Sequence, residues 1–267
     1  MRGPINYIGG KNRLANVIIE RIPAHLTYIE PFSGGARVFF RKAPSKVEVL
    51  NDLDGELVNF YRVCQNHHEE LARSMRFMPV SREWFVGLEK SSLEGLTDIQ
   101  RAARFLYLQK LSYGGRITRK AYAIRVLEKA NLRSDAIAET LDETHSRLIG
   151  VQIEHLPYDE VIRRYDRPGT FFYLDPPYYD IRLYNYNLEH DDFVRMVELL
   201  RNIKGKFLLS LNDRPEVRKL FAGFHIETVK IAYSLHRKAG RRHHELLISN
   251  YQQMRSGPKI SLADEAA

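Results

Sequence analysis

The stretch Thr170-Phe171-Phe172-Tyr173-Leu174-Asp175-Pro176-Pro177-Tyr178 decides the fold class. Residues 170–174 are apolar almost without interruption, which is typical of a central strand whose two faces are both covered by helices. The two prolines that follow cannot continue a central strand, so the carboxylate of Asp175 comes directly after the strand's carboxyl end. Because reactive groups in open α/β sheets collect beyond the carboxyl ends of strands, the stretch predicts an α/β fold with Asp175 at its functional edge.

The segments on either side of this stretch alternate between strand and helix patterns. On the N-terminal side the pattern predicts a helix at 12–22, a strand at 26–30, a glycine turn at 31–35, a helix at 36–42, a strand at 46–50 followed by Asn51-Asp52, and a helix at 55–64. On the C-terminal side it predicts strands at 152–155, 207–211, 226–235 and 245–251, and a helix at 192–202. The succession of strand, glycine turn, helix, strand and acidic residue is the opening of a doubly wound sheet.

The segment between these two parts has a different pattern. From residue 67 to about residue 150 the apolar residues recur at helical spacing, as in Phe105, Leu106 and Leu108. We therefore expect a mainly helical insertion. The expected organisation is a catalytic domain formed by residues 1–64 and 151–253, an insertion at 65–150 and a flexible tail at 254–267.

The composition limits the class of protein. The chain has 267 residues, and 41 Lys and Arg against 33 Asp and Glu give a net charge of +8, which favours a polyanionic partner such as nucleic acid. Its single cysteine, Cys64, excludes an internal disulfide framework and a cysteine-based zinc site, and we expect it to be buried among apolar residues. No apolar run reaches membrane-spanning length and the N-terminus lacks a signal-peptide core, so a cytoplasmic protein is expected. Adjacent histidines, His243 and His244, point to opposite faces of a strand, so no metal site is expected.

A second motif lies at the first junction between strand and helix. Glu30-Pro31-Phe32-Ser33-Gly34-Gly35 places two glycines where a ligand can approach the backbone, before the predicted helix at 36–42. Asp52 ends the next strand, at the separation from which an acidic residue binds ribose hydroxyls in nucleotide-binding folds. The glycine pattern is not Gly-x-Gly-x-x-Gly and no Gly-Lys-Ser/Thr follows, which disfavours a dinucleotide or a nucleoside triphosphate.

Together these motifs resemble those of the Dam-like, class D12 DNA N6-adenine methyltransferases. The resemblance is carried by Tyr7-Ile8-Gly9-Gly10-Lys11, Glu30-Pro31-Phe32-Ser33-Gly34-Gly35, Asn51-Asp52-Leu53-Asp54 and Asp175-Pro176-Pro177-Tyr178, with Ser210-Leu211-Asn212-Asp213 and Glu245-Leu246-Leu247-Ile248-Ser249-Asn250-Tyr251 as later motifs. Their order is that of the alpha group of the family. The resemblance implies a Rossmann-like S-adenosylmethionine-dependent methyltransferase sheet with an inserted, mainly helical target-recognition domain. It also implies transfer of a methyl group to the N6 of a flipped adenine in a specific duplex DNA sequence.

The resemblance also assigns a set of residues to the cofactor S-adenosylmethionine. These are Tyr7, Gly10, Lys11, Pro31, Phe32, Gly34, Gly35, Asp52 and Asp159. Within this set, Asp52 would hold the ribose and Asp159 would contact the adenine of the cofactor, with a helix N-cap as the alternative role of Asp159. The glycine turn reads Gly-Gly-Ala where many relatives have Gly-x-Gly.

The predicted catalytic residues Asp175, Pro176, Pro177 and Tyr178 suit methyl transfer to an aromatic amine. The N6 of adenine is a poor nucleophile because its lone pair is delocalised into the ring. The carboxylate of Asp175 and the backbone carbonyl of Pro176 can accept hydrogen bonds from the two N–H groups of N6. These bonds stabilise the positive charge that grows on the nitrogen. The ring of Tyr178 can stack on a base taken out of the duplex, or it can pack in the core instead.

Two basic segments are predicted to contact the phosphates of double-stranded DNA. The candidate residues are Tyr113, Arg116, Arg119, Lys120 and Arg125 around a polar loop of the insertion, and Arg237, Lys238, Arg241 and Arg242 between the last two predicted strands. Each segment is equally consistent with a solvated loop. Binding through them would associate a cytoplasmic protein with the nucleoid.

Other functions remain open on the same fold. Methylation of cytosine N4 uses the same amino-group chemistry, although its motif more often begins with Ser. Enzymes that methylate glutamine side chains carry Asn-Pro-Pro-Tyr, so Asp175 disfavours a protein-amide or RNA methyltransferase. The intact Asp175 and Tyr178 disfavour a catalytically silent DNA-binding module. The insertion lacks a Phe-Asn-x-Pro-Phe-Gly-type segment, which enzymes that act on GATC carry, so GATC is disfavoured as the target.

Overall fold

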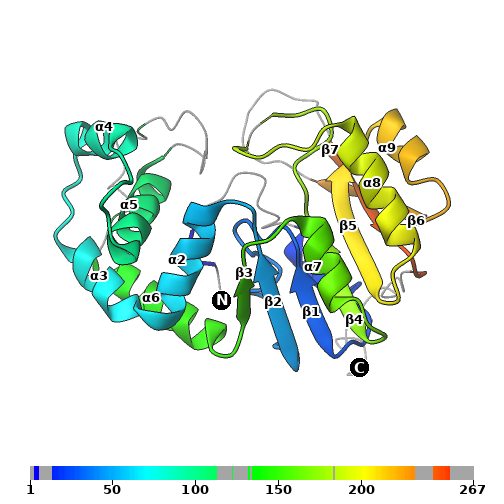
Figure 1. Ribbon diagram of the computed structural model, residues 1–267, viewed down its shortest axis with the longest axis horizontal. Helices are drawn as coiled ribbons and strands as arrows, with labels where there is room; N and C mark the ends of the chain where they lie inside the picture. The colour runs from blue at the N-terminus through cyan, green and yellow to red at the C-terminus, as the bar shows by residue number, and fades with distance from the viewer. Residues whose placement is uncertain are drawn as a thin grey trace, which may run out of the picture.

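The computed structural model describes residues 3–5, 14–112, 122, 132, 134–182, 184–231 and 243–252. The described residues form one seven-stranded sheet in the order β3-β2-β1-β4-β5-β7-β6 (Figure 1). The strands are β1 (Thr27–Glu30), β2 (Val47–Asn51), β3 (Gln152–Glu154), β4 (Thr170–Leu174), β5 (Lys206–Asn212), β6 (His225–Ile231) and β7 (His243–Ser249). Strands β1 to β5 pair in parallel, whereas β7 runs antiparallel to both of its neighbours. The predicted α/β sheet is confirmed, and it is consistent with a methyltransferase fold.

The strand order reverses between β1 and β4. From β1 the chain moves outward to β2 and β3, and it then returns to the other side of β1 to build β4 and β5. Ligands of open parallel sheets bind in the crevice beyond the carboxyl ends of the two adjacent strands at which the strand order reverses. Because β1 ends at Glu30 and β4 ends at Leu174, the two motifs of the sequence meet at this point of the fold.

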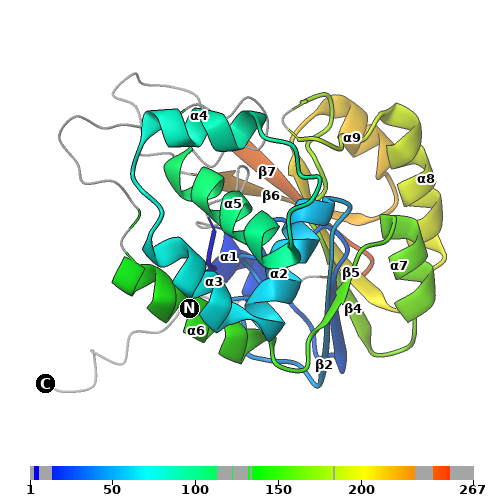
Figure 2. The ribbon, with the colours of Figure 1, turned by 60° about the vertical axis from the view of Figure 1, so that its left-hand side comes forward.

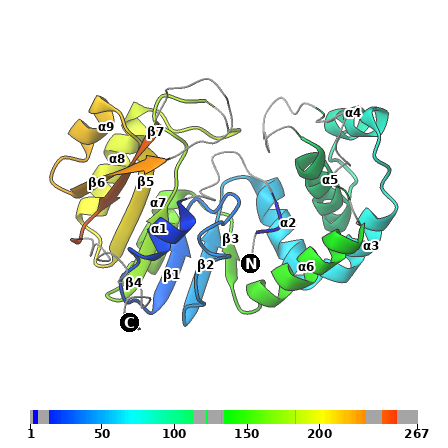
Figure 3. The same ribbon diagram turned by 180° about the vertical axis from the view of Figure 1, so that it is seen from behind.

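Helices cover both faces of the sheet. They are α1 (Ala15–Ile19), α2 (Gly55–Asn66), α3 (His68–Arg76), α4 (Arg82–Lys90), α5 (Asp98–Leu111), α6 (Ser134–Leu148), α7 (Tyr158–Tyr165), α8 (His190–Arg201) and α9 (Pro215–Leu220). In β4, Phe171 and Tyr173 belong to the buried cluster that includes α1 and α2, whereas Phe172 and Leu174 belong to the cluster that includes α7, α8 and α9. Seen from behind, α1 covers the face opposite to α7 and α8 (Figure 3). All of β4 is buried, which confirms the predicted central strand.

Helices α3 to α6 lie together beside α2 (Figure 2). Among the described residues from 67 to 150, the regular elements are the helices α3 to α6, and an isolated β-bridge joins Ser112 to Tyr122. Helix α5 begins with a capping box in which Thr97 and Gln100 exchange hydrogen bonds. Arg147 of α6 forms an ion pair with Glu48 of β2 at 2.5 Å, and the rings of Phe60 and Phe105 lie 5.4 Å apart. These helices therefore share one buried core with the sheet, and the predicted boundary at residue 64 falls within the last turn of α2.

The predicted helix at 36–42 is wrong. These residues form a run of turns, and Ala36 has a φ of 46°, which is in the left-handed region. The backbone N–H of Phe39 donates to the carboxylate of Glu30 at 2.9 Å instead of to a carbonyl one helical turn earlier. A tertiary hydrogen bond thus replaces a helical one, and no helix N-terminus from this segment faces the glycine turn.

The sequence pattern also missed two short helices. Helix α7 has eight residues and α9 has six, which is too short for a periodic pattern to be recognised. Helix α1 is shorter than the predicted helix at 12–22, whose first two residues lie outside the described residues. The remaining predicted elements differ from the observed ones by one or two residues at their ends wherever the structure describes them.

Two expectations from composition can be compared with the structure. Cys64 is fully buried, as predicted, and it forms no disulfide. Burial raises the pKa of its thiol, which disfavours the reactive thiolate. Among the described residues, no helix combines the length and the apolar character needed to cross a membrane.

Candidate active site

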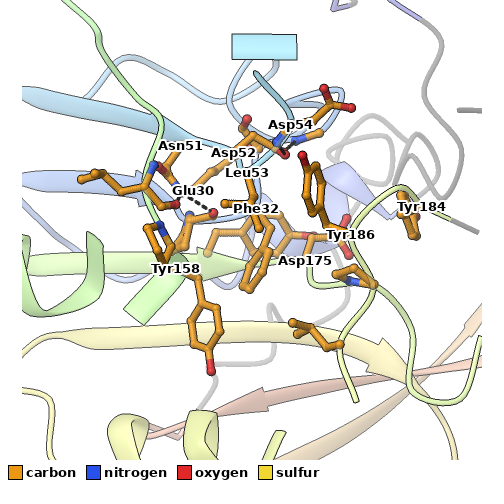
Figure 4. A pocket seen from close by; sticks show the side chains of 18 of the residues that line it. Glu30, Phe32, Asn51, Asp52, Leu53, Asp54, Tyr158, Asp175, Tyr184 and Tyr186 are labelled. Carbon is orange, nitrogen blue, oxygen red and sulfur yellow. Dashed lines mark hydrogen bonds between the residues drawn. The ribbon is translucent and has the colours of Figure 1, made fainter. Parts of the chain in front are cut away.

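A cavity of about 550 Å³ lies beyond the carboxyl ends of β1 and β4 (Figure 4). This volume is within the range of small-molecule sites, which is roughly 300 to 1,000 Å³. The lining consists of residues 30–38 after β1, 51–54 after β2, 156–159 after β3, and Tyr173, Asp175, Pro177 and 184–188 from β4 and its loop, with Arg163, Asp192 and Arg195 from α7 and α8. The predicted cofactor motif and the predicted catalytic motif therefore line the same cavity.

The predicted catalytic tetrapeptide, residues 175–178, begins directly after the carboxyl end of β4. Asp175 and Pro177 line the cavity, and Pro176 is buried. The carboxylate of Asp175 accepts a hydrogen bond of 3.0 Å from the hydroxyl of Ser210. Tyr178 is partly buried and is not part of the cavity lining, and its hydroxyl donates to the carboxylate of Glu245 at 2.8 Å. The structure thus brings Asp175 and Pro177 to the cavity and anchors Tyr178 to β7.

A second carboxyl group, that of Glu30, lines the cavity near Asp175. Glu30 is only 1% exposed, and its Oε1 accepts hydrogen bonds from the hydroxyl of Tyr28 at 2.7 Å and from the N–H of Phe39 at 2.9 Å. Burial, with a smaller contribution from the negative charge of Asp175, raises the pKa of Glu30 from 4.5 to about 8. Glu30 is therefore largely protonated at neutral pH and adds no second negative charge beside Asp175.

The carboxylate of Asp52 is held by the backbone of two loops. Its Oδ2 accepts from the N–H of Gly34 at 2.8 Å and its Oδ1 from the N–H of Asp54 at 3.0 Å. Gly34 has a φ of 46°, a conformation that glycine adopts without steric cost. Burial raises the pKa of Asp52 from 3.8 to about 6, and the hydrogen bonds from Asp54 and Gly34 limit the rise. Asp52 is therefore ionised at neutral pH and can accept further hydrogen bonds from hydroxyl groups.

Asn51, the last residue of β2, joins the loops that follow β1 and β3. Its Nδ2 donates to the carbonyls of Pro31 at 2.9 Å and Leu156 at 3.0 Å, and its Oδ1 accepts from the N–H of Leu156 at 2.9 Å. The side chain is 1% exposed, so these bonds are shielded from water. Asn51 belongs to the motif Asn51-Asp52-Leu53-Asp54 but is not among the predicted site residues. Its position at the end of a strand between β1 and β3 is the signal that identifies its role.

Aromatic rings and an ion pair form the wall nearest to α7. The rings of Phe32 and Tyr158 are stacked with their centroids 5.3 Å apart. Asp159 lines the cavity from the second residue of α7. The alternative N-cap role for Asp159 is wrong, because Pro157 precedes the helix at that position. Asp159 forms an ion pair with Arg163 one turn along α7, so a ligand would have to share its carboxylate with that side chain.

The loop after the tetrapeptide forms the remaining wall of the cavity. Tyr184, Asn185 and Tyr186 line it, and Nδ2 of Asn185 donates to the carboxylate of Asp54 at 3.3 Å. Tyr186 is 52% exposed, so a large aromatic ring is open to a ligand beside the cavity (Figure 4). These residues are not among the predicted site residues. The repeated Tyr-Asn pairs at 184–187, shortly after the tetrapeptide, are a signal that could have found them.

Polar side chains of β5 and β7 form hydrogen bonds with the tetrapeptide and with the residue that follows it. Besides the bond from Ser210 to Asp175, Asn212 clamps the backbone of Tyr179: its Oδ1 accepts from the N–H at 3.0 Å and its Nδ2 donates to the carbonyl at 3.1 Å. Asn212 pairs with Glu245 in the antiparallel register of β5 and β7. Ser210 and Asn212 are two residues apart on a strand and therefore project to the same side. These residues belong to the later motifs of the resemblance but are not among the predicted site residues.

The other predicted site residues lie outside the part of the chain that the structure describes. They are Tyr7, Gly10 and Lys11 for the cofactor, and Tyr113, Arg116, Arg119, Lys120, Arg125, Arg237, Lys238, Arg241 and Arg242 for DNA. Within the described residues, no group of three or more His, Cys, Asp and Glu side chains is arranged to hold a metal ion.

Comparisons with known proteins agree with this arrangement. Residues 7–235 match the family described as D12 class N6 adenine-specific DNA methyltransferase. The chain is 26% identical over 273 residues to the type II methyltransferase M1.LlaDCHI of Lactococcus lactis subsp. cremoris, which covers 92% of this chain and 94% of that protein. It is 25% identical over 264 residues to the type II methyltransferase M.CviBI of Paramecium bursaria Chlorella virus NC1A, covering 94% and 100%. Its similarity to the DNA adenine methylase of Escherichia coli (strain K12) is 26% identity over 118 residues, covering 43% and 42%.

The family match extends over most of the chain, and it includes the glycine turn, Asp52 and the tetrapeptide that line the cavity. Two relatives align with this chain over nearly their whole length, so the similarity is not confined to one segment. The protein belongs to the D12 class of N6 adenine-specific DNA methyltransferases and is an adenine-specific DNA methyltransferase.

Proposed function

We propose that the cavity beyond β1 and β4 binds S-adenosylmethionine at its Asp52 end and the target adenine at its Asp175 end. The observation that carries this proposal is that the glycine turn, Asp52 and Asp175 line one cavity at the point where the strand order reverses. A methyl group passes directly between two bound molecules only if both reach the same space. A single cavity with two chemically different ends meets that requirement.

The residues at the Asp52 end suit S-adenosylmethionine. The carboxylate of Asp52, fixed by two backbone N–H groups, offers acceptors to the ribose hydroxyls. Phe32, Leu156 and Tyr158 offer aromatic and apolar surface to an adenine ring. Gly34 has no side chain, so a ligand can approach its backbone closely. When bound, the cofactor supplies an electrophilic methyl group on a positively charged sulfur.

The contribution of the chain to the chemistry lies in Asp175 and Pro176. The carboxylate of Asp175 and the backbone carbonyl of Pro176 accept the two N–H bonds of the target amine. These contacts localise the nitrogen lone pair and stabilise the positive charge that grows on the nitrogen. Because proline fixes φ at positions 176 and 177, the carbonyl is positioned before the substrate arrives. Glu30 is protonated at neutral pH and so does not repel the carboxylate of Asp175.

We propose a specific sequence in double-stranded DNA as the substrate, with the target adenine turned out of the helix and stacked on Tyr178. The hydrogen bond from Tyr178 to Glu245 supports this role, because it anchors the hydroxyl end of the ring. The net charge of +8 and the basic segments around 116–125 and 237–242 support contact with phosphates. We assign target recognition to the helical region at 65–150, which lacks the segment found in enzymes that act on GATC, and therefore propose a different target sequence.

Detection of modified bases in DNA from a host that expresses this chain tests the assignment of base and target together. We expect N6-methyladenine at every occurrence of one short motif, and none in DNA from a host that expresses Asp175→Ala. Detection of N4-methylcytosine instead would show that the target base is cytosine and not adenine. Modified adenine that persists with Asp175→Ala would remove the tetrapeptide from the mechanism.

A further inference from the structure

Two buried hydroxyl groups, those of Ser210 and Tyr173, are linked by hydrogen bonds to the carboxylate of Asp175. The hydroxyl of Ser210 donates to Oδ1 of Asp175 at 3.0 Å, and the hydroxyl of Tyr173 lies 3.0 Å from that of Ser210. Ser210, on β5, is 0% exposed, and Tyr173, on β4, is 2% exposed. The side chains of Tyr173 and Asp175 both contact the hydroxyl of Ser210, so they lie on the same side of the sheet.

The direction of these two hydrogen bonds follows from the number of protons that each hydroxyl group can donate. A serine hydroxyl has one proton to donate, and Ser210 gives it to the carboxylate of Asp175, which is acceptor-only when ionised. The bond between Tyr173 and Ser210 must then be donated by Tyr173. The sequence Tyr173 to Ser210 to Asp175 is therefore a one-way relay that ends on the carboxylate, and each bond polarises the next.

We propose that Ser210 is a positioning residue for methyl transfer, which it serves by fixing the rotation of the Asp175 carboxylate, and that Tyr173 in turn fixes Ser210. This inference rests on the proposed role of Asp175 as an acceptor of the target amine. An acceptor of this kind contributes only if its oxygen lies where the N–H bond will point in the transition state. An aspartate at the end of a strand can rotate about two bonds, and the buried hydroxyl on the adjacent strand β5 removes that freedom.

The position of the relay argues for function rather than for stability alone. Elsewhere on β5 the inward polar group Asn212 holds backbone atoms of the loop, whereas Ser210 holds the one carboxylate of the tetrapeptide. Small errors in the placement of a catalytic group are costly, since a displacement of about 1 Å can lower a rate roughly a hundred-fold. Loss of the Ser210 hydroxyl should therefore act on the chemical step and leave Asp52 intact, because Asp52 is held by the N–H groups of Gly34 and Asp54.

The test compares Ser210→Ala with Ser249→Ala. Ser249, on the neighbouring strand β7, is also 0% exposed, but its hydroxyl donates to the carbonyl of Tyr251. Single-turnover methylation is measured with saturating enzyme and labelled S-adenosylmethionine on duplex DNA, and cofactor affinity is measured by calorimetry. We expect Ser210→Ala to slow methyl transfer about ten-fold or more with a cofactor dissociation constant within about two-fold of the wild type. Ser249→Ala is expected to react at the wild-type rate.

Two further variants complete the test. Ser210→Thr keeps the hydroxyl and is expected to react faster than Ser210→Ala. Tyr173→Phe removes the hydrogen bond from Tyr173 to Ser210 and is expected to slow transfer about three-fold. If thermal unfolding shows that Ser210→Ala does not fold, Tyr173→Phe decides the question. A rate for Ser210→Ala within two-fold of the wild type, or an equal loss in Ser249→Ala, would overturn the proposal. If Asp175→Ala is itself active, the proposed role of Asp175 fails. If Asp175→Ala is inactive and Ser210→Ala is not impaired, only this inference fails.

Discussion

The hydroxyl of Tyr178 donates a 2.8 Å hydrogen bond to the carboxylate of Glu245, which joins the last residue of the tetrapeptide to a strand 67 residues further along the chain. Glu245 is only 2% exposed and pairs in register with Asn212, which clamps the backbone of Tyr179. The ring of Tyr178 is thus held at its hydroxyl end, and the loop that carries it is held at its backbone. A ring fixed in this way can serve as a rigid surface for a base.

Variants of Tyr178 separate the role of the ring from the role of its hydroxyl. Tyr178→Phe keeps the ring but loses the bond to Glu245, and we expect kcat to fall roughly ten-fold. Tyr178→Ala also loses the stacking surface, and we expect a fall of roughly a hundred-fold. Steady-state methylation of a duplex that contains the target site measures both. Tyr165→Phe, which removes a tyrosine–glutamate hydrogen bond between two residues that do not line the cavity, is the matched control. Wild-type activity in Tyr178→Ala would leave Tyr178 with a packing role only.

Cofactor binding is expected to depend on pH through Asp52. The pKa of its carboxyl group is raised to about 6, so its proton-free form, which accepts hydrogen bonds from ribose hydroxyls, is lost as the pH falls through 6. The dissociation constant of S-adenosylmethionine, measured by calorimetry, should therefore rise between pH 7 and pH 5. In Asp52→Asn the affinity should be weaker at pH 7 and nearly independent of pH over this interval. The same pH dependence in both proteins would assign the titration to another group.

Because of Glu30, the free energy of unfolding is expected to fall as the pH rises, whereas an ordinary paired carboxylate makes it rise. Its pKa is raised from 4.5 to about 8, so the folded state binds a proton more tightly than the unfolded state does. The stabilisation is complete below pH 4.5 and is lost as the pH rises through 8. Between pH 5 and pH 8 the free energy of unfolding should fall by about 3 kcal/mol through this group.

The variant Glu30→Gln isolates this contribution. A glutamine oxygen can accept the same bonds from Tyr28 and Phe39, and its amide mimics the protonated carboxyl group. Urea unfolding at pH 5, 7 and 8 should show that the stability of Glu30→Gln falls less with pH than that of the wild type. Parallel curves for the two proteins would show that Glu30 does not change its protonation in this interval.

The basic segment at 237–242 should determine part of the salt dependence of DNA binding. Replacement of Arg237, Lys238, Arg241 and Arg242 by glutamine should weaken binding and reduce the slope of log K against log salt by up to about 3.6, at about 0.9 per phosphate contact. The control removes the same charge at the exposed Arg167, Arg201, Lys204 and Lys206, near the amino ends of β4 and β5. Titrations at several salt concentrations measure both slopes. Equal slopes of log K against log salt in the two variants would show that the segment affects DNA binding only through the net charge of the protein.

The sequence predicts the parts of the site that depend on local pattern. An apolar run closed by two prolines locates Asp175 at a strand end, and the glycine turn with Asp52 locates the other end of the cavity. The fold then brings them together because both follow strands at the reversal of strand order.

The parts that the sequence does not reveal depend on contacts between distant segments. Residues 36–42 have a helical pattern, but the N–H of Phe39 binds Glu30, whose carboxyl group is available only once β1 is in place. The polar groups that hold the tetrapeptide come from β5 and β7. That Glu245 lies opposite Asn212 follows from the antiparallel register of these strands, which no local pattern specifies.

The most direct test of the central claim is single-turnover methyl transfer by Asp175→Ala, with cofactor binding measured on the same preparation. Purified wild-type protein with methyl-labelled S-adenosylmethionine and duplex DNA should yield label in N6-methyldeoxyadenosine after digestion to nucleosides. Asp175→Ala should bind the cofactor with an affinity close to that of the wild type and transfer no measurable label. Transfer by Asp175→Ala above a few per cent of the wild-type rate, or label on a base other than adenine in the wild-type reaction, would contradict the account.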